Sequence, residues 1–401
     1  MNSLVDELSI KNDTKIIFLV MDGLGGLRSA GKKGTELQVA HSPNLDKLAQ
    51  DSICGLMDPI LPGVTPGSGP AHFALFGYNP VEANIGRGVL EAAGINLPLT
   101  DRDVAIRINF ATRDADGNIT DRRAGRLATD INKRICEKIR KNVSIAPEAE
   151  FVIETVKEHR AVLVIRGDDL GGDINDTDPQ KLGVPPLEPE AGDEASGKTV
   201  KIVKRFLEQA HDLIADEPAG NTMLLRGFAK HKPYKSMMER FKLKTLAVAN
   251  YPMYRGVAFL LDMDLNPVTA DTKTEFEAVK ENYDKYDFFF VHVKGTDARG
   301  EDGDFDAKVK VIEEVDSLLP MLTGLNPDVM VVTADHSTPA EMSSHSWHPV
   351  PVLVHSNICR VDDVQTFDEI ACINGGLGRM PSMNLMPIVL GNAGRLTKFG
   401  A

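Results

Sequence analysis

Three aspartates each stand at or just after the end of an apolar run. Asp22 follows KIIFLVM, Asp297 comes shortly after YDFFFVHV, and Asp335 follows DVMVVTA. One aspartate in such a place is more often a turn residue or a helix cap. Three that converge would repel one another strongly unless a cation lay between them. His336 and His345 lie close by in sequence, and imidazole with carboxylate suits Mn²⁺, Zn²⁺ or Fe²⁺ better than Ca²⁺. The pattern therefore favours a metal site.

The segment VHVKGTDARGEDGDF, residues 291–305, adds more carboxylates directly after one of these runs. We predict a dense acidic loop here, which contains Asp297, Glu301, Asp302 and Asp304. A solvated surface loop would explain this composition, and so would a loop that contributes metal ligands. The choice depends on whether the three apolar runs form neighbouring strands.

Ser68 lies between two glycines in GVTPGSGPAHFALFGY, just before an apolar pattern of helical spacing. A glycine-rich turn in which Ser68 or Gly69 caps the helix is the simpler interpretation. A nucleophilic serine is the alternative, because glycines let a phosphate approach closely and a helix N-terminus favours its charge. A free hydroxyl is a weak nucleophile, and direct binding to a metal would activate it.

Positive charge is concentrated in the middle of the chain, although the net charge is -13. This overall charge argues against nucleic acid or an anionic membrane as a partner. An anionic small molecule would need a local group of basic side chains. The segments TDRRAGR, EHRAVLVIRG and LLRG contain such a group, namely Arg122, Arg123, Arg126, His159, Arg160, Arg166 and Arg226. Each one singly is better explained as a surface ion-pair partner, but together they suggest a holder for phosphate and carboxylate.

The elements that would position these residues alternate between strand and helix, which predicts an α/β fold. The three apolar runs are typical of parallel strands covered on both faces. Ligands of such sheets bind beyond the carboxyl ends of the strands, where the aspartates would lie. We also predict helices after Ser42 and over residues 130–141, 196–215 and 305–319, and strands over 103–110, 160–166 and 351–355.

Apolar runs that end near an aspartate occur toward both ends of the chain, whereas the middle of the chain has a different pattern. We therefore predict a discontinuous metal-binding domain of residues 1–98 and 236–401, with a smaller domain of residues 99–235 inserted. Within the insertion, residues 167–195 are irregular and rich in Gly, Pro and Asp. Loops of this length are usually functional or mobile.

The sequence also predicts a cytoplasmic protein. Its four cysteines lie far apart and form no CxxC pair, which indicates thiols in a reducing compartment rather than a zinc site or disulfides. The first residues lack the basic-then-apolar order of a signal peptide. No apolar run approaches the about 18 residues that cross a bilayer.

Several long segments together resemble one known family. MDGLGG, TPGSGPAH, FGYNP, GRGVLEAAGI, DRRAGR, HVKGTD and ADHSTP, in this order, resemble the archaeal-type branch of the cofactor-independent phosphoglycerate mutases. The resemblance covers nearly the whole chain, and the wider relation is the alkaline phosphatase superfamily. It implies an alkaline-phosphatase-like three-layer α/β core with a mostly parallel sheet, plus an inserted smaller α+β cap domain.

The resemblance also implies roles for the candidate residues. Ser68 matches the nucleophile that takes the phosphoryl group of 3-phosphoglycerate and returns it to the 2-hydroxyl of the same glycerate, without 2,3-bisphosphoglycerate. The cap would bind the glycerate and close to exclude water. Two divalent metal ions are implied, Mn²⁺ foremost, with Mg²⁺, Zn²⁺ or Co²⁺ possible. One ion matches Asp22, Ser68, Asp335 and His336, and the other matches Asp297 and His345. The expected substrate contacts are Arg122, Arg123, Arg126, His159, Arg160, Arg226 and Lys294.

The chain departs from the family pattern at one position. The family has an aspartate, three residues and then a histidine, whereas this chain has Glu301 in place of that histidine. A carboxylate oxygen is a harder ligand than an imidazole nitrogen. We therefore expect the second site to prefer Mn²⁺ or Mg²⁺ over Zn²⁺, or else to bind more weakly.

Two other functions remain open. A metal-dependent phosphomonoesterase, or a mutase for another small phosphorylated metabolite, would share the metal core and differ only in the inserted domain. The arginine cluster favours a small acid that carries both phosphate and carboxylate. A degenerate relative that only binds phosphorylated metabolites is the third possibility. Glu301 favours a degenerate relative, but the presence of Ser68 and all the other matched ligands argues against one.

Overall fold

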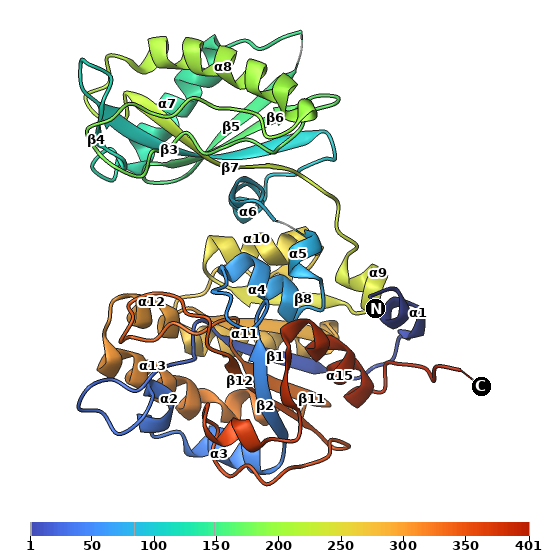
Figure 1. Ribbon diagram of the computed structural model, residues 1–401. Coiled ribbons are helices and arrows are strands. Elements are labelled where there is room, and N and C mark those ends of the chain that lie inside the picture. The colour runs from blue at the N-terminus through green and yellow to red at the C-terminus, as the bar shows by residue number, and fades with distance from the viewer. Residues whose placement is uncertain (1, 84, 148, 401) are drawn as a thin grey trace. The chain divides into compact units, whose positions relative to one another are not determined.

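The chain folds into two compact units, drawn as a ribbon in Figure 1. The computed structural model describes residues 2–83, 85–147 and 149–400. Both ends of the chain form the larger unit, and the smaller unit is inserted between them; the bounds are Met1–Asn84 with Tyr234–Ala401, and Ile85–Pro233. Among the described residues, no helix is long and apolar enough to span a membrane.

The first boundary lies earlier than predicted. We expected the insertion to begin at residue 99, but helix α6 (Arg87–Gly94) already belongs to the smaller unit. This helix packs on strand β3 (Asp103–Arg113) so closely that a Cβ atom on Gly88 would lie 2.2 Å from the carbonyl oxygen of Ala105. Gly88 therefore allows α6 to pack directly on the sheet of the smaller unit. The second boundary lies two residues from the prediction, after Pro233 rather than after residue 235.

An eight-stranded sheet forms the centre of the larger unit, in the order β13-β2-β12-β11-β1-β10-β8-β9. Its strands are β1 (Ile16–Met21), β2 (Ile53–Asp58), β8 (Thr245–Ala249), β9 (Asp264–Leu265), β10 (Phe288–Val293), β11 (Val329–Thr333), β12 (Val350–Ser356) and β13 (Gly378–Pro381). Strand β1 lies between β10 and β11 and is parallel to both. All residues of these three strands are buried, which explains their unbroken apolar runs. Only β12 runs antiparallel to its neighbours, so the predicted mostly parallel sheet is confirmed.

Helices cover both faces of this sheet (Figure 1). The described helices of this unit are α1 (Asn2–Leu8), α2 (Glu36–Val39), α3 (Pro43–Gln50), α4 (Ser68–Leu75), α5 (Pro80–Ala83), α9 (Met237–Phe241), α10 (Pro252–Leu260), α11 (Thr272–Asn282), α12 (Gly295–Glu301), α13 (Phe305–Leu318), α14 (Pro320–Thr323) and α15 (Leu385–Asn392). Ser42 is the N-cap residue of α3 and Pro43 its first residue, as predicted. Helix α13 likewise agrees with the prediction to within one residue.

Helix α12 corrects one prediction. We expected an acidic loop from Asp297, but Gly295–Glu301 is helical, with Asp297 in its first turn. An acidic residue there is stabilised by the positive end of the helix dipole. Gly300 of this helix allows close packing, because a Cβ atom on it would lie 2.1 Å from the carbonyl oxygen of Thr338.

The smaller unit is an α+β structure built on an antiparallel sheet. Besides β3, its strands are β4 (Ile119–Asp121), β5 (Glu150–Lys157), β6 (Arg160–Arg166) and β7 (Thr222–Lys230), and besides α6 its helices are α7 (Thr129–Asn142) and α8 (Glu194–Ile214). Ile106 and Ile108 of β3 join side chains of α7 and α8 in one apolar core. Because side chains alternate along a strand, Arg107 and Asn109 point to the opposite face.

Candidate functional site

The three predicted aspartates lie at one edge of the larger sheet. Asp22 directly follows β1, Asp335 comes shortly after β11, and Asp297 lies in α12, the helix after β10. The carboxyl ends of these neighbouring parallel strands meet there. All three aspartate side chains are buried. The strand order therefore brings three carboxylates together away from water.

Three donor atoms gather beside the hydroxyl of Ser68. Nε2 of His336 lies 3.1 Å from Oγ of Ser68. The same nitrogen lies 3.2 Å from Oδ2 of Asp335 and 3.3 Å from Oδ1 of Asp22. These two carboxylate oxygens are buried and lack a hydrogen-bond partner among the described residues. A cation with ligands at about 2.1 Å keeps neighbouring ligand atoms roughly 3.0–3.4 Å apart, so this spacing fits a small divalent metal ion.

A second group of donors surrounds Asp297. Nε2 of His345 lies 3.6 Å from Oδ1 of Asp297 and 3.9 Å from Oε1 of Glu301. Nδ1 of His345 donates to the carbonyl oxygen of Pro66 at 3.0 Å, which leaves the lone pair on Nε2, toward Asp297. Asp297, His336 and His345 offer donor atoms within 4.8 Å of one another. Glu301 lies at the exposed end of this group, with 55% of its side chain accessible.

Lys294 lies between the two groups. Its ammonium donates to Oδ2 of Asp22 at 2.9 Å and also to Oδ2 of Asp297. Burial lowers the pKa of Lys294, but the charges of these two aspartates outweigh burial and raise that pKa above its usual value. Sequence reasoning assigned Lys294 to substrate binding, and the structure places it among the candidate metal ligands.

Three buried side chains around this site were missed by sequence reasoning. Tyr254 donates to Oδ2 of Asp22, and His292 lies 3.5 Å from the same oxygen. His72 lies 3.3 Å from Oδ2 of Asp335. His72 and His292 lie within TPGSGPAH and HVKGTD, two segments of the family resemblance, but no role was assigned to either histidine, and Tyr254 belongs to no motif. Only their place beside the aspartates reveals them.

These neighbours set the charge of the site. Burial alone would raise the pKa of Asp22, but the neighbouring imidazole of His292 and the charge of the Lys294 ammonium hold that pKa well below its usual value. Burial lowers the pKa of His336, so its imidazole is neutral at neutral pH. The site therefore presents an ionised carboxylate and a neutral imidazole, the forms that bind metal ions.

Ser68 is the first residue of α4, and Gly67 is its N-cap. The interpretation of Ser68 or Gly69 as the cap is therefore wrong. Ser68 is buried, and its hydroxyl faces His336. The N-terminus of a helix favours negative charge, so a phosphoryl group at this hydroxyl would be stabilised.

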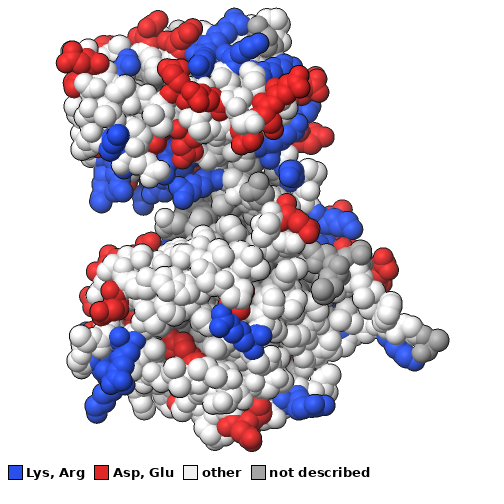
Figure 2. Space-filling model, in the orientation of Figure 1, with Lys and Arg blue, Asp and Glu red and all other residues white. Residues whose placement is uncertain are grey.

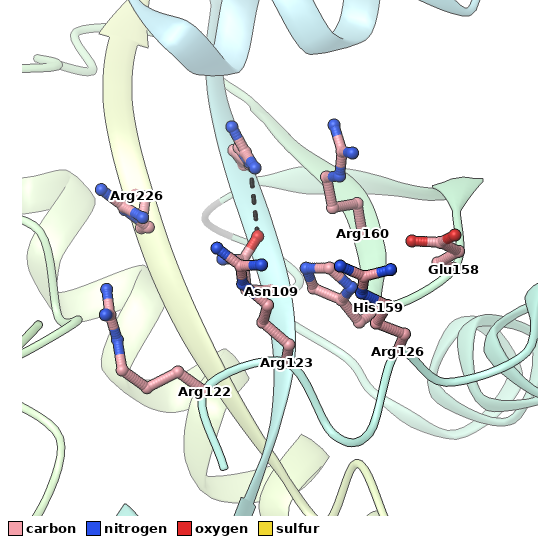
Figure 3. A pocket seen from close by; sticks show the side chains of 9 residues that line it. Asn109, Arg122, Arg123, Arg126, Glu158, His159, Arg160 and Arg226 are labelled. Atoms are coloured by element: carbon pink, nitrogen blue, oxygen red, sulfur yellow. Dashed lines mark hydrogen bonds between the residues drawn. The ribbon is translucent and has the colours of Figure 1, made fainter. Parts of the chain in front are cut away.

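The smaller unit contains a cavity of about 350 Å³ lined mainly by arginines (Figure 3). Its lining residues are Arg107, Asn109, Arg122, Arg123, Arg126, Glu158, His159, Arg160 and Arg226. The structure thus brings together all six residues that were predicted in this unit to bind substrate. Arg107 and Asn109 were missed, because in an alternating strand they resemble ordinary solvent-facing positions. Figure 2 shows how densely Lys and Arg side chains gather on part of the surface of this unit.

Positive charge is crowded in this cavity. Burial lowers the pKa of Arg107, and the charges of Arg160 and Arg226 act in the same direction. Burial and then the charge of Arg160 lower the pKa of His159 to about 4, so His159 is neutral at neutral pH. A small molecule with more than one negative charge would relieve this repulsion, and guanidinium groups bind phosphate and carboxylate through paired hydrogen bonds.

Two aspartates of the predicted irregular stretch, residues 167–195, bind the side chains of two arginines of the cavity. Asp178 is buried and accepts from Nε of Arg122 at 2.9 Å and from Nη2 at 2.7 Å. Nη1 of Arg226 lies 3.4 Å from Asp178, and its Nε donates to Asp176 at 3.4 Å. The stretch therefore orients Arg122 and Arg226 before any ligand binds. Arg166 is bound outside the cavity, to Asp103 at 2.6 Å.

Comparison with known proteins places the chain in a family. Residues 49–220 match the family model for 2,3-bisphosphoglycerate-independent phosphoglycerate mutase. A protein of Thermus thermophilus, named a probable 2,3-bisphosphoglycerate-independent phosphoglycerate mutase, is 45% identical over 98% of each chain. The solved cofactor-independent phosphoglycerate mutase of Thermoplasma acidophilum is 30% identical, with a TM-score of 0.73 over 95% of this chain and 100% of that one. A solved protein of Pyrococcus horikoshii is 29% identical, with a TM-score of 0.83 over 98% of this chain and 100% of that one. The chain therefore belongs to the family of 2,3-bisphosphoglycerate-independent phosphoglycerate mutases.

Proposed function

We propose that this enzyme interconverts 3-phosphoglycerate and 2-phosphoglycerate through a phosphoserine at Ser68, beside two divalent metal ions. Its family relationship supports the interconversion of phosphoglycerates. One observation carries the finer proposal. The hydroxyl of Ser68 lies at a helix N-terminus and 3.1 Å from Nε2 of His336, which itself lies 3.3 Å from Asp22 and 3.2 Å from Asp335 through carboxylate oxygens that accept no hydrogen bond from the described residues.

The two groups of donors described above would each hold one ion. Asp22, Ser68, Asp335 and His336 form the first set, and Asp297, Glu301 and His345 the second. Bound there, the ions would lower the pKa of the Ser68 hydroxyl and offset the charge of the phosphoryl group. Mn²⁺ is the ion that we propose, because mixed carboxylate and imidazole ligands suit it. Mg²⁺, Zn²⁺ and Co²⁺ are the alternatives to be compared with it.

Two phosphoryl transfers complete the reaction. In the first, the Ser68 hydroxyl loses its proton and its Oγ attacks phosphorus, the bond from phosphorus to O3 breaks, and glycerate leaves with a proton on O3. In the second, the 2-hydroxyl of the retained glycerate loses its proton and attacks phosphorus, the bond from phosphorus to Oγ breaks, and Oγ of Ser68 takes up a proton. Ser68 itself carries the phosphoryl group, so the reaction needs no 2,3-bisphosphoglycerate. Lys294 contributes a fixed positive charge to the site.

The arginine cavity would bind the phosphate and carboxylate of the substrate. We assign this role to Arg122, Arg123, Arg126, Arg160 and Arg226, with neutral His159 as a hydrogen-bonding partner. Retention of glycerate while Ser68 is phosphorylated separates a mutase from a phosphatase, since water would otherwise hydrolyse the phosphoserine. A cytoplasmic location belongs to the same proposal.

A coupled assay tests this function. Protein stripped with a chelator is reloaded with Mn²⁺ and supplied with 3-phosphoglycerate and enolase, without 2,3-bisphosphoglycerate, while free phosphate is measured in parallel. We expect Mn²⁺-dependent product that is lost in Ser68→Ala. Free phosphate in place of 2-phosphoglycerate would identify a phosphomonoesterase, and neither product would identify a binding protein or another substrate.

A further inference from the structure

Lys308 is a fully buried cation in the larger unit, on helix α13. Its ammonium donates three hydrogen bonds to backbone carbonyl oxygens, those of Gly23 at 2.9 Å, Gly25 at 3.1 Å and Thr338 at 2.8 Å. A buried ammonium is costly to desolvate, and helix packing alone would be served by an apolar side chain. The ammonium of Lys308 thus donates all three of its hydrogen bonds to the backbone of two loops.

These loops are the β1 loop, residues 22–27, and the β11 loop, residues 335–340. Glu36, whose Oε1 lies 3.9 Å from the ammonium, accepts from the backbone of Ala340 at 2.7 Å and of Leu27 at 3.2 Å. Glu369 accepts from the backbone of Gly26 at 2.8 Å. Glu36 and Glu369, whose charges balance that of Lys308, thus accept hydrogen bonds from backbone N–H groups of the two loops. Lys308 donates hydrogen bonds to carbonyl oxygens of the same two loops.

Both loops carry candidate metal ligands. Asp22 begins the β1 loop, and Asp335 and His336 begin the β11 loop. Thr338 connects them to the second group, because its hydroxyl donates to Oδ1 of Asp297 at 2.6 Å and lies 3.0 Å from Nδ1 of His336. A shift of the Thr338 backbone would therefore move the hydroxyl that orients Asp297 and His336.

We propose that Lys308 is a positioning residue for the metal site. It fixes the spacing of the β1 and β11 loops through their carbonyl oxygens, and Thr338 transmits that spacing to Asp297 and His336. The proposal rests on the proposed function, in that these residues bind divalent ions. Partners of this kind orient the ligands of a metal, and their loss typically weakens metal binding.

Manganese binding by Lys308→Met tests the proposal. Free Mn²⁺ is followed by electron paramagnetic resonance during titration of the metal-free protein. We expect the dissociation constant to rise about 10- to 100-fold. The matched control is Arg395→Met, because Arg395 is also fully buried in this unit and donates to backbone carbonyl oxygens, those of Asn12 and Thr14 at 2.8 Å. Both variants should lose thermal stability, but only Lys308→Met should lose Mn²⁺ affinity.

A second pair of variants keeps the test decisive if Lys308→Met does not fold. Thr338→Val removes the hydroxyl, and we expect Mn²⁺ to bind about tenfold more weakly. Thr338→Ser restores the hydroxyl and should restore the affinity. Wild-type Mn²⁺ affinity in Thr338→Val, or in a folded Lys308→Met, would overturn the inference. A wild-type protein that binds no Mn²⁺ would contradict the proposed function instead.

Discussion

Oγ of Ser68 lies 3.1 Å from Nε2 of His336, which joins the N-terminus of α4 to the loop after β11. The imidazole is neutral because burial lowers its pKa. Its Nδ1 lies 3.0 Å from the hydroxyl of Thr338, so Nε2 is the nitrogen that faces the serine. One neutral nitrogen therefore lies within reach of the candidate nucleophile and of two aspartates, and the proposed phosphoryl transfer depends on this arrangement.

Replacement of Glu301 by histidine should change the metal preference. Nε2 of His345 lies 3.9 Å from Oε1 of Glu301, so a nitrogen donor at residue 301 would share the second site with it. Imidazole favours Zn²⁺ more than a carboxylate does. We expect the ratio of activity with Zn²⁺ to activity with Mn²⁺ to rise about tenfold in Glu301→His. The ratio is measured in chelator-stripped protein reloaded with each ion, and an unchanged ratio would remove Glu301 from the ligand set.

Replacement of Asp178 by asparagine should weaken substrate binding. Asp178 holds Arg122 through two hydrogen bonds, and without its charge that guanidinium loses its fixed orientation in the cavity. We expect the KM for 3-phosphoglycerate to rise about tenfold, equivalent to about 1.4 kcal/mol. Asp103→Asn is the control, because Asp103 binds Arg166 with the same geometry outside the cavity. Equal effects of the two variants on KM would mean that Asp178 has only a structural role.

Replacement of Lys294 by methionine should make the protein more dependent on metal. The ammonium balances the buried charges of Asp22 and Asp297, and breaking a buried pair costs about 3–5 kcal/mol. We expect metal-free Lys294→Met to melt at a lower temperature than the wild type, and Mn²⁺ to raise its Tm by more. Lys235→Met, at an exposed ion pair with Asp6, should behave like the wild type. An equal gain from Mn²⁺ in Lys294→Met and wild type would refute this role.

Glu275 should make the larger unit less stable as the pH rises. Burial raises its pKa to about 8, and the charges of Asp271 and Glu314 contribute. The folded state therefore holds this proton more tightly than the unfolded state. The stabilisation is complete below the pKa of the unfolded glutamate and is lost as the pH rises through about 8.

Glu275→Gln isolates this effect, because glutamine does not ionise. The free energy of unfolding of the variant minus that of the wild type should increase by about 3–4 kcal/mol between about pH 5 and pH 8. Urea denaturation at several pH values measures the difference. Glu277→Gln, at a half-exposed position of the same helix, is the control and should show no comparable increase. A flat difference for Glu275→Gln would contradict the prediction.

The fold followed from sequence where local pattern and burial agree. The apolar runs before Asp22, Asp297 and Asp335 predicted three covered parallel strands, and these strands are neighbours in the sheet. Prediction failed where contacts distant in sequence decide the structure. In helix α12 the Thr338 backbone approaches Gly300, and α6 joins the smaller unit through its contact with β3. Neither contact leaves a local signal.

The candidate site divides in the same way. Residues within motifs, such as Ser68 and His336, were found from their types and spacing. Tyr254 and Lys308 come from segments with no motif, and only the sheet brings them to Asp22 and its loop. Arg107 was hidden because strand alternation does not tell which solvent-facing side chains line a cavity. The sequence therefore predicted the kind of site and its motif residues. The side chains that support these residues could be identified only from the tertiary structure.

Direct capture of a phosphorylated Ser68 tests the proposed reaction most directly. Mn²⁺-loaded protein is mixed with 3-phosphoglycerate, quenched in acid within a turnover, digested, and analysed by mass spectrometry, with Ser68→Ala and metal-free protein in parallel. We predict a peptide that gains one phosphoryl group at Ser68 only in the metal-loaded wild type. Steady production of 2-phosphoglycerate with no such peptide, or with full activity in Ser68→Ala, would contradict the account.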